Sequence, residues 1–159
     1  MSKGEKRTAF FLALVMVLAM AACGSSVDNG GSAAKTTPAS GDVVAAELPE
    51  GWSLVSGTEM HGVDGADFIC HAKEFELGDP YLQATKEDRD ITAMRTVLES
   101  EDPFGSYYGS KELNNGTWYI AENAAATVIG EKVCLVRGYE CDFESAEVQN
   151  ILGSLQWAD

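Results

Sequence analysis

Residues 132–140 form a segment whose apolar side chains point to both sides of an extended chain. Val133, Leu135 and Tyr139 fall on one side, and Cys134 and Val136 fall on the other. A strand that is buried on both sides needs structure packed against each face of its sheet. This segment therefore predicts a sheet with covered faces, and it constrains the fold more than any other part of the chain.

The segments before residue 132 predict an antiparallel meander. Strands are expected near residues 107–113 and over residues 117–122, the latter continuing into residues 124–129. Asn115-Gly116 predicts a type I′ hairpin turn, because both turn residues must accept positive φ. Gly130-Glu131 then turns the chain into the strand described above. The second half of the chain is thus predicted to be rich in β-structure.

The chain is predicted to close with an amphipathic helix. Ser145 can cap its first turn. Its apolar residues recur at helical spacing: Val148, Ile151, Leu152 and Leu155. One face of this helix is therefore expected to pack against the sheet.

Two further helix signals lie in the middle of the chain. Asp90 can cap a helix in which Met94 and Leu98 recur at helical spacing. Asp79-Pro80 also fits a helix opening, with Asp as the cap and Pro at the first helical position, and it predicts a helix over residues 81–88.

The first half also contains strands. A short strand is expected at residues 52–55, followed by a turn-rich stretch over residues 57–65 and a longer strand over residues 67–75. Short strands, a helical middle, a meander and a closing helix together indicate an α+β protein, with helices packed against an antiparallel sheet. We expect this to be a single domain over residues 48–159.

Three stretches of this region resemble the PsbP-like fold. They are residues 48–52 (LPEGW), residues 117–122 (TWYIAE), and residues 142–155 from Asp-Phe to the end of the closing helix, and the hairpin before Lys132 adds to the resemblance. The resemblance implies an α/β/α sandwich. Known members of this family act largely by binding protein partners, so the resemblance also implies an interaction module without a transferable catalytic site.

The N-terminal residues have the pattern of an export signal. Lys3, Lys6 and Arg7 precede an apolar run over residues 9–22, which is shorter than the roughly 20 residues that a membrane span needs. Ala21, Ala22 and Cys23 follow at its end, and this pattern resembles the lipobox of bacterial lipoproteins.

The resemblance implies a signal peptide over residues 1–22, cleavage between Ala22 and Cys23, and a lipid on Cys23 that anchors the chain on the extracytoplasmic side of the cell membrane. The alternative is an ordinary signal peptide that releases a free secreted protein. Residues 23–47 are rich in Gly, Ser, Thr, Ala and Pro, so they are expected to form a disordered tether.

The charge of the chain excludes one class of partner. Its formal net charge is −14, and an acidic surface repels nucleic acid and anionic headgroups. The lipid is therefore expected to bind the membrane, with no contribution from the domain surface. The acidity could attract cations or basic peptides, or serve solubility alone.

Three cysteines remain after Cys23. Cys70 could pair with Cys134 or Cys141 across strands, or all three could be plain buried thiols. A metal site joining Cys70-His71 with another Cys is disfavoured, because sequence neighbours on a strand point to opposite faces. Neither a metal nor another cofactor is predicted. Acidic residues between positions 140 and 147 lack the spacing of an EF-hand.

No motif for catalysis accompanies the two histidines, His61 and His71, so we predict no enzymatic activity. The open alternative is a Cys134 or Cys141 nucleophile assisted by His71. The predicted function is noncatalytic binding of an envelope protein or component. Its candidate contacts are the aromatic residues Tyr107, Tyr108, Trp118 and Tyr119. The alternative function is binding of a small molecule or metal in a pocket between sheet and helix.

Overall fold

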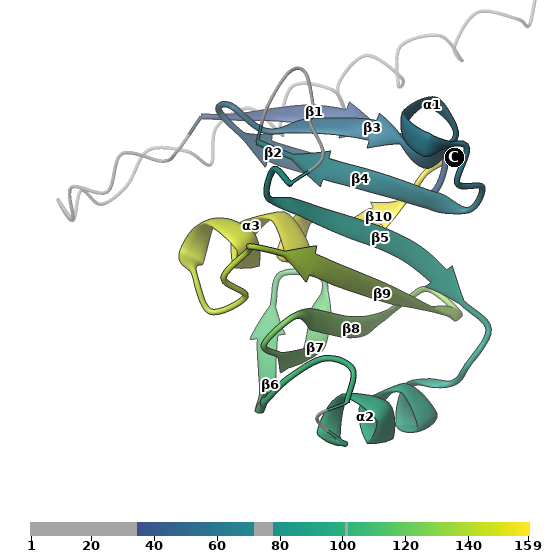
Figure 1. Ribbon diagram of the computed structural model, residues 1–159, viewed down its shortest axis with the longest axis vertical. Coiled ribbons are helices and arrows are strands. Elements are labelled where there is room, and N and C mark those ends of the chain that lie inside the picture. The colour runs from purple at the N-terminus through teal and green to yellow at the C-terminus, as the bar shows by residue number, and fades with distance from the viewer. Residues whose placement is uncertain (1–34, 72–77, 101) are drawn as a thin grey trace, which may run out of the picture. The chain divides into compact units, whose positions relative to one another are not determined.

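The computed structural model describes residues 35–71, 78–100 and 102–159, which belong to one compact unit, Ala34–Asp159 (Figure 1). The predicted signal peptide, Cys23 and the first part of the predicted tether lie outside the described residues. So does the end of the strand that was expected to run to residue 75.

The main sheet has seven antiparallel strands in the order β3-β4-β5-β9-β8-β7-β6 (Figure 1). The strands are β3 (Ser53–Ser56), β4 (Ala66–Cys70), β5 (Tyr81–Glu87), β6 (Tyr107–Leu113), β7 (Gly116–Ala121), β8 (Ala124–Ile129) and β9 (Lys132–Tyr139). The strand predicted to be buried on both sides is β9, and it occupies the middle of this sheet. The α+β class is thus confirmed, with more sheet than helix.

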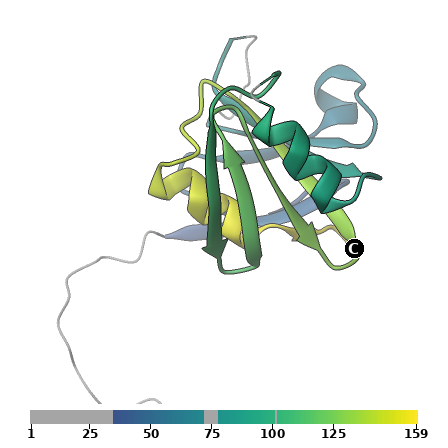
Figure 2. The same cartoon turned by 90° about the horizontal axis from the view of Figure 1, so that it is seen from below.

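The sheet separates two apolar cores. Leu135 and Val133 of β9 belong to one core, which contains Met94 and Leu98 of helix α2 (Ile91–Glu99). Cys134 and Val136 belong to the other, together with the buried face of helix α3 (Ala146–Ser154). The two helices therefore cover opposite faces, as Figures 1 and 2 show.

A second sheet lies on the α3 side. It has three strands in the order β1-β2-β10: β1 (Thr36–Ser40), β2 (Val44–Pro49) and β10 (Gln156–Trp157). Val44 and Leu48 of β2 are buried in the same core as α3. The tether predicted to extend to residue 47 is therefore wrong from residue 36 onward, because these residues are paired and packed.

The helix caps follow the sequence closely. The Asp90 carboxylate accepts a hydrogen bond from the backbone N–H of Ala93 at 2.8 Å, and the Ser145 hydroxyl accepts one from Val148 N–H at 3.3 Å. The helices predicted to begin after Asp90 and after Ser145 are confirmed. A short helix, α1 (Gly57–His61), occupies part of the predicted turn-rich stretch.

Two local predictions are wrong. Residues 81–87 form strand β5 and no helix, because they pair with β4 on one side and β9 on the other. The hairpin between β6 and β7 is present, but its turn residues are Asn114 and Asn115, since Leu113 pairs with Gly116. Among the described residues only Glu140 is a non-glycine with positive φ, so this turn is not type I′.

Candidate functional site

The four aromatic residues predicted as contacts have different environments. Trp118 is fully buried, and its indole Nε1 donates to Asn115 Oδ1 at 2.8 Å, so it belongs to the core and cannot touch a partner. Tyr107 and Tyr119 are half-buried against the α2 core. Tyr108 is the exposed member of this group, with 47% of its surface accessible to solvent.

Tyr108 lies at an irregularity in β6. The pairing with β7 shifts between Tyr107 and Gly109, which leaves Tyr108 outside the ladder. Its pKa is raised, first by desolvation and then by the negative charges of Glu122, Glu144 and Asp142. An exposed aromatic ring thus lies within an acidic surface.

Strand β6 is one of the two outer strands of the seven-stranded sheet, and β3 is the other (Figure 2). The Thr127 hydroxyl of β8 donates to the Thr117 carbonyl at 2.7 Å, so the backbone of Thr117 points toward β8. Glu112 pairs with Thr117, so the backbone N–H and C=O of Glu112 point away from β7. Backbone groups alternate in direction along a strand, so the N–H and C=O of Ser110 point outward as well.

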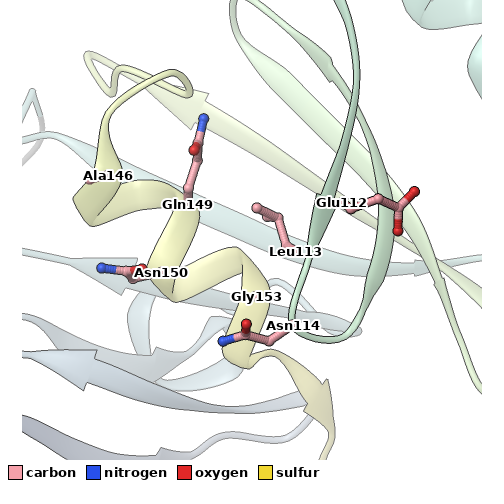
Figure 3. A pocket seen from close by; sticks show the side chains of 7 residues that line it. All are labelled: Glu112, Leu113, Asn114, Ala146, Gln149, Asn150 and Gly153. Carbon is pink, nitrogen blue, oxygen red and sulfur yellow. The ribbon is translucent and has the colours of Figure 1, made fainter. Parts of the chain in front are cut away.

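A hollow lies between this edge and helix α3 (Figure 3). Its cavity volume is about 170 Å³, and its lining is mainly polar: Glu112, Leu113, Asn114, Ala146, Gln149, Asn150 and Gly153. Figure 3 shows Leu113 turned toward α3 and Glu112 turned away from it. The Lys111 ammonium donates to the Gln149 side chain at the rim.

The hairpin holds its place beside α3 through an amide. Asn115 Nδ2 donates to the carbonyls of Leu152 and Leu155 at 2.8 and 2.9 Å. Both carbonyls lie at the C-terminal end of α3, where Leu155 is the C-cap and its backbone N–H also donates to the Leu152 carbonyl. The strand edge and the helix are therefore linked rigidly, and the hollow between them has defined walls.

Cys70, Cys134 and Cys141 are all present as thiols. Cys70 pairs with Tyr81, which pairs with Tyr139, so its side chain points to the α2 side of the sheet. Cys134 points to the α3 side, and Cys141 packs against the α3 core. Cys134 is therefore not placed to form a disulfide with Cys70.

Burial makes two of these thiols poor nucleophiles. It raises the pKa of Cys134 to about 12. Burial, followed by the charges of Glu140 and Glu147, raises the pKa of Cys141 to about 11. The Cys141 thiol donates to the Tyr81 carbonyl at 3.4 Å. Since the thiolate is the reactive form, these environments oppose nucleophilic chemistry near neutral pH.

His71 is exposed and contacts Trp52, with 5.2 Å between ring centroids. The Trp52 indole Nε1 donates to Glu147 at the start of α3, at 3.0 Å. His71 is thus part of a surface contact between the sheet and α3. Within residues 35–71, 78–100 and 102–159 no three His, Cys, Asp or Glu side chains gather as a metal site. The side chain of His61 lies outside the described part.

Asp67 is a buried carboxylate that the sequence reasoning missed. It is fully buried in β4 and accepts from the backbone N–H groups of Asp42, Val43 and Val44 at 3.0, 2.7 and 2.8 Å. A single charged residue inside the otherwise apolar run of residues 66–70 is the signal that could have revealed it. Its role is to join β4 to the loop between β1 and β2.

The fold defines an α+β protein built on antiparallel sheets. Comparisons with protein-family models, curated proteins and solved structures find no match to this chain. No helix in the described portion is long and apolar enough to cross a membrane.

Proposed function

We propose that this protein is a lipoprotein anchored on the extracytoplasmic side of the cell membrane, whose folded unit is a noncatalytic module that binds a protein partner near the membrane surface. The export pattern and Cys23 support the anchor. The open β6 edge beside the exposed Tyr108 is the observation that supports the binding module. We further propose that the unit is a PsbP-like sandwich, which its helices on opposite sheet faces would suit.

The raised pKa values of Cys134 and Cys141 support a noncatalytic role. A cysteine nucleophile needs a lowered pKa or an adjacent base. Cys134 faces the α3 core, whereas His71 is exposed and makes a tilted ring contact with Trp52, so a Cys134–His71 pair is not assembled.

The hollow beside α3 bears on the alternative of a small-molecule or metal site. Its volume of about 170 Å³ is below the roughly 300–1,000 Å³ of common ligand pockets. Neither His71 nor a cysteine lines it. A groove that borders an open strand suits a segment of another protein better than an enclosed small ligand.

A crosslinking pull-down from membranes tests the proposal, with the lipidated chain compared with the Cys23→Ala variant. We expect one or a few proteins to be captured by the first and lost from the second, and labelled palmitate to enter only the first. Equal capture by both would refute a role for the anchor. No captured protein would refute a stable protein partner and favour the small-ligand alternative.

A further inference from the structure

The described residues form two sheets with four outer strands between them, and β6 is the best suited of these to accept another strand. β10 has two residues, β3 has four, and β1 carries Pro38 in its middle. Short length and proline both hinder pairing with a further chain. β6 has seven residues, contains no proline, and directs the backbone groups of Ser110 and Glu112 outward.

We propose that the β6 edge binds an extended, lysine- or arginine-bearing segment of a partner protein, which pairs with β6 as an added strand of the main sheet. This inference rests on the proposed function and names the kind of partner. Backbone pairing at Ser110 and Glu112 supplies affinity, and the surroundings of the edge select the side chains.

The charges around the edge select a basic segment. Glu112 lies in the strand, and the negative charges of Glu122, Glu144 and Asp142 act on Tyr108 near its other end. The one cation on the strand, Lys111, is held by Gln149. A lysine or arginine of the arriving segment can contact the Tyr108 ring, and another can pair with a carboxylate further along the edge.

The hollow gives the added strand a place for its side chains. Successive residues of a strand point to opposite faces, so every second side chain of a segment on β6 faces α3. There it meets the amide of Asn150, which can donate and accept hydrogen bonds, and it passes Gln149, whose amide is already bonded to Lys111 and to the Phe143 carbonyl. We therefore expect polar residues at these positions of the partner.

A second copy of this chain is a poorer occupant. Two copies joined at β6 would bring together two sets of the same carboxylates, in chains that each carry a net charge of −14. Like charges placed opposite each other oppose association. Charge complementarity thus favours a basic partner.

The test measures binding of a labelled eight-residue peptide, in which lysine alternates with threonine, to the processed, lipidated protein in detergent micelles. Fluorescence anisotropy reports the binding. A peptide with glutamate in place of lysine is the charge control. Ser110→Pro removes the outward backbone N–H, which takes no part in the pairing with β7. Ser110→Thr is the matched control, because it keeps this N–H. Circular dichroism establishes that each variant is folded. The double variant E122Q/E144Q provides a second measurement that leaves the backbone intact.

We expect the lysine peptide to bind saturably to the original protein. Ser110→Pro should weaken this binding about tenfold or more, because it removes one or two backbone hydrogen bonds to the peptide. Ser110→Thr should bind within about twofold of the original protein, E122Q/E144Q should bind more weakly, and the glutamate peptide should not bind. Absence of binding, equal binding of both peptides, or full binding by folded Ser110→Pro would overturn the proposal.

Two outcomes separate this inference from the proposed function. If Ser110→Pro still captures the same membrane partner in the pull-down, the binding module stands and the β6 edge is the wrong surface. If sedimentation detects a dimer of the original protein that Ser110→Pro abolishes, the edge joins two copies and the basic partner is wrong.

Discussion

Asp67 joins the two sheets through a single side chain. Oδ1 of its carboxylate accepts from Asp42 N–H, and Oδ2 accepts from Val43 and Val44 N–H. Hydrogen bonds to a charged acceptor are worth more than neutral ones, and a buried group that loses its partner costs further free energy. Gly41 stands beside this carboxylate, where a Cβ would collide with it.

Replacement of Asp67 by Asn should lower the free energy of unfolding by about 3 kcal/mol. Asparagine has the same shape, but its NH₂ group would face N–H donors where a carboxylate oxygen now accepts. Urea unfolding measures the change. Asp88→Asn is the matched control, because its side chain is 100% exposed and it should change stability by less than about 0.5 kcal/mol. A loss below about 1 kcal/mol for Asp67→Asn would contradict the role assigned to this carboxylate.

Cys134 should make stability depend on alkaline pH. Its folded pKa of about 12 lies above the ordinary value of 9.0, so the neutral thiol is favoured in the folded state. The stabilisation is fully present below pH 9.0 and is lost as the pH rises toward 12. Between pH 8 and 10.5 this thiol should account for a loss of about 2 kcal/mol.

Urea unfolding at the two pH values measures that loss, and Cys134→Ala should remove it from the pH dependence. Val136→Ala lies in the same strand and the same core but lacks a titratable group, so it should keep the original pH dependence. If Cys134→Ala keeps the pH dependence of the original protein, burial does not raise the pKa of the Cys134 thiol.

At the scale of elements, the hairpin of β1 and β2 is the main departure from the sequence-based prediction. Its composition of Thr, Pro, Ala and Ser resembles a linker. Val44 and Leu48 nevertheless bury their side chains in the α3 core, and β10 pairs with β2 from the far end of the chain. Burial of these few apolar residues, with the hydrogen bonds to Asp67, orders the segment.

Val44→Ala should therefore lower the free energy of unfolding by about 2 kcal/mol, since it removes two buried methyl groups and leaves a cavity. Val128→Ala is the control, because Val128 is 41% exposed and should change stability by less than about 0.5 kcal/mol. Thermal unfolding of both variants compares them. If the two behave alike, residues 36–47 act as a tether.

At the scale of the folded unit, β9 is shared by both cores. Its alternate residues belong to the core that contains α2 on one face and to the core that contains α3 and β2 on the other. This is the arrangement that its two apolar faces predicted, and it places β9 at the centre of the main sheet. The edge of that sheet lies three strands away at β6, where the candidate binding surface is found.

The sequence by itself determined the elements whose signals are local. Asp90 and Ser145 cap helices because each side chain reaches an N–H three residues ahead. The apolar alternation of β9 and the hairpin before β7 also depend on neighbouring residues only. The candidate site is predictable in part. The aromatic side chain of Tyr108 marks it as a candidate contact, but the sequence does not show that this side chain is exposed.

Only the tertiary structure decided which segments pair and which side chains are covered. Residues 81–87 are a strand because β4 and β9 flank them, despite a sequence that fits a helix opening. Trp118 is core because α3 closes over it, and the β6 edge is open because no described strand pairs beyond it. Pairing and burial depend on groups far away in the chain, and a local pattern carries no information about them.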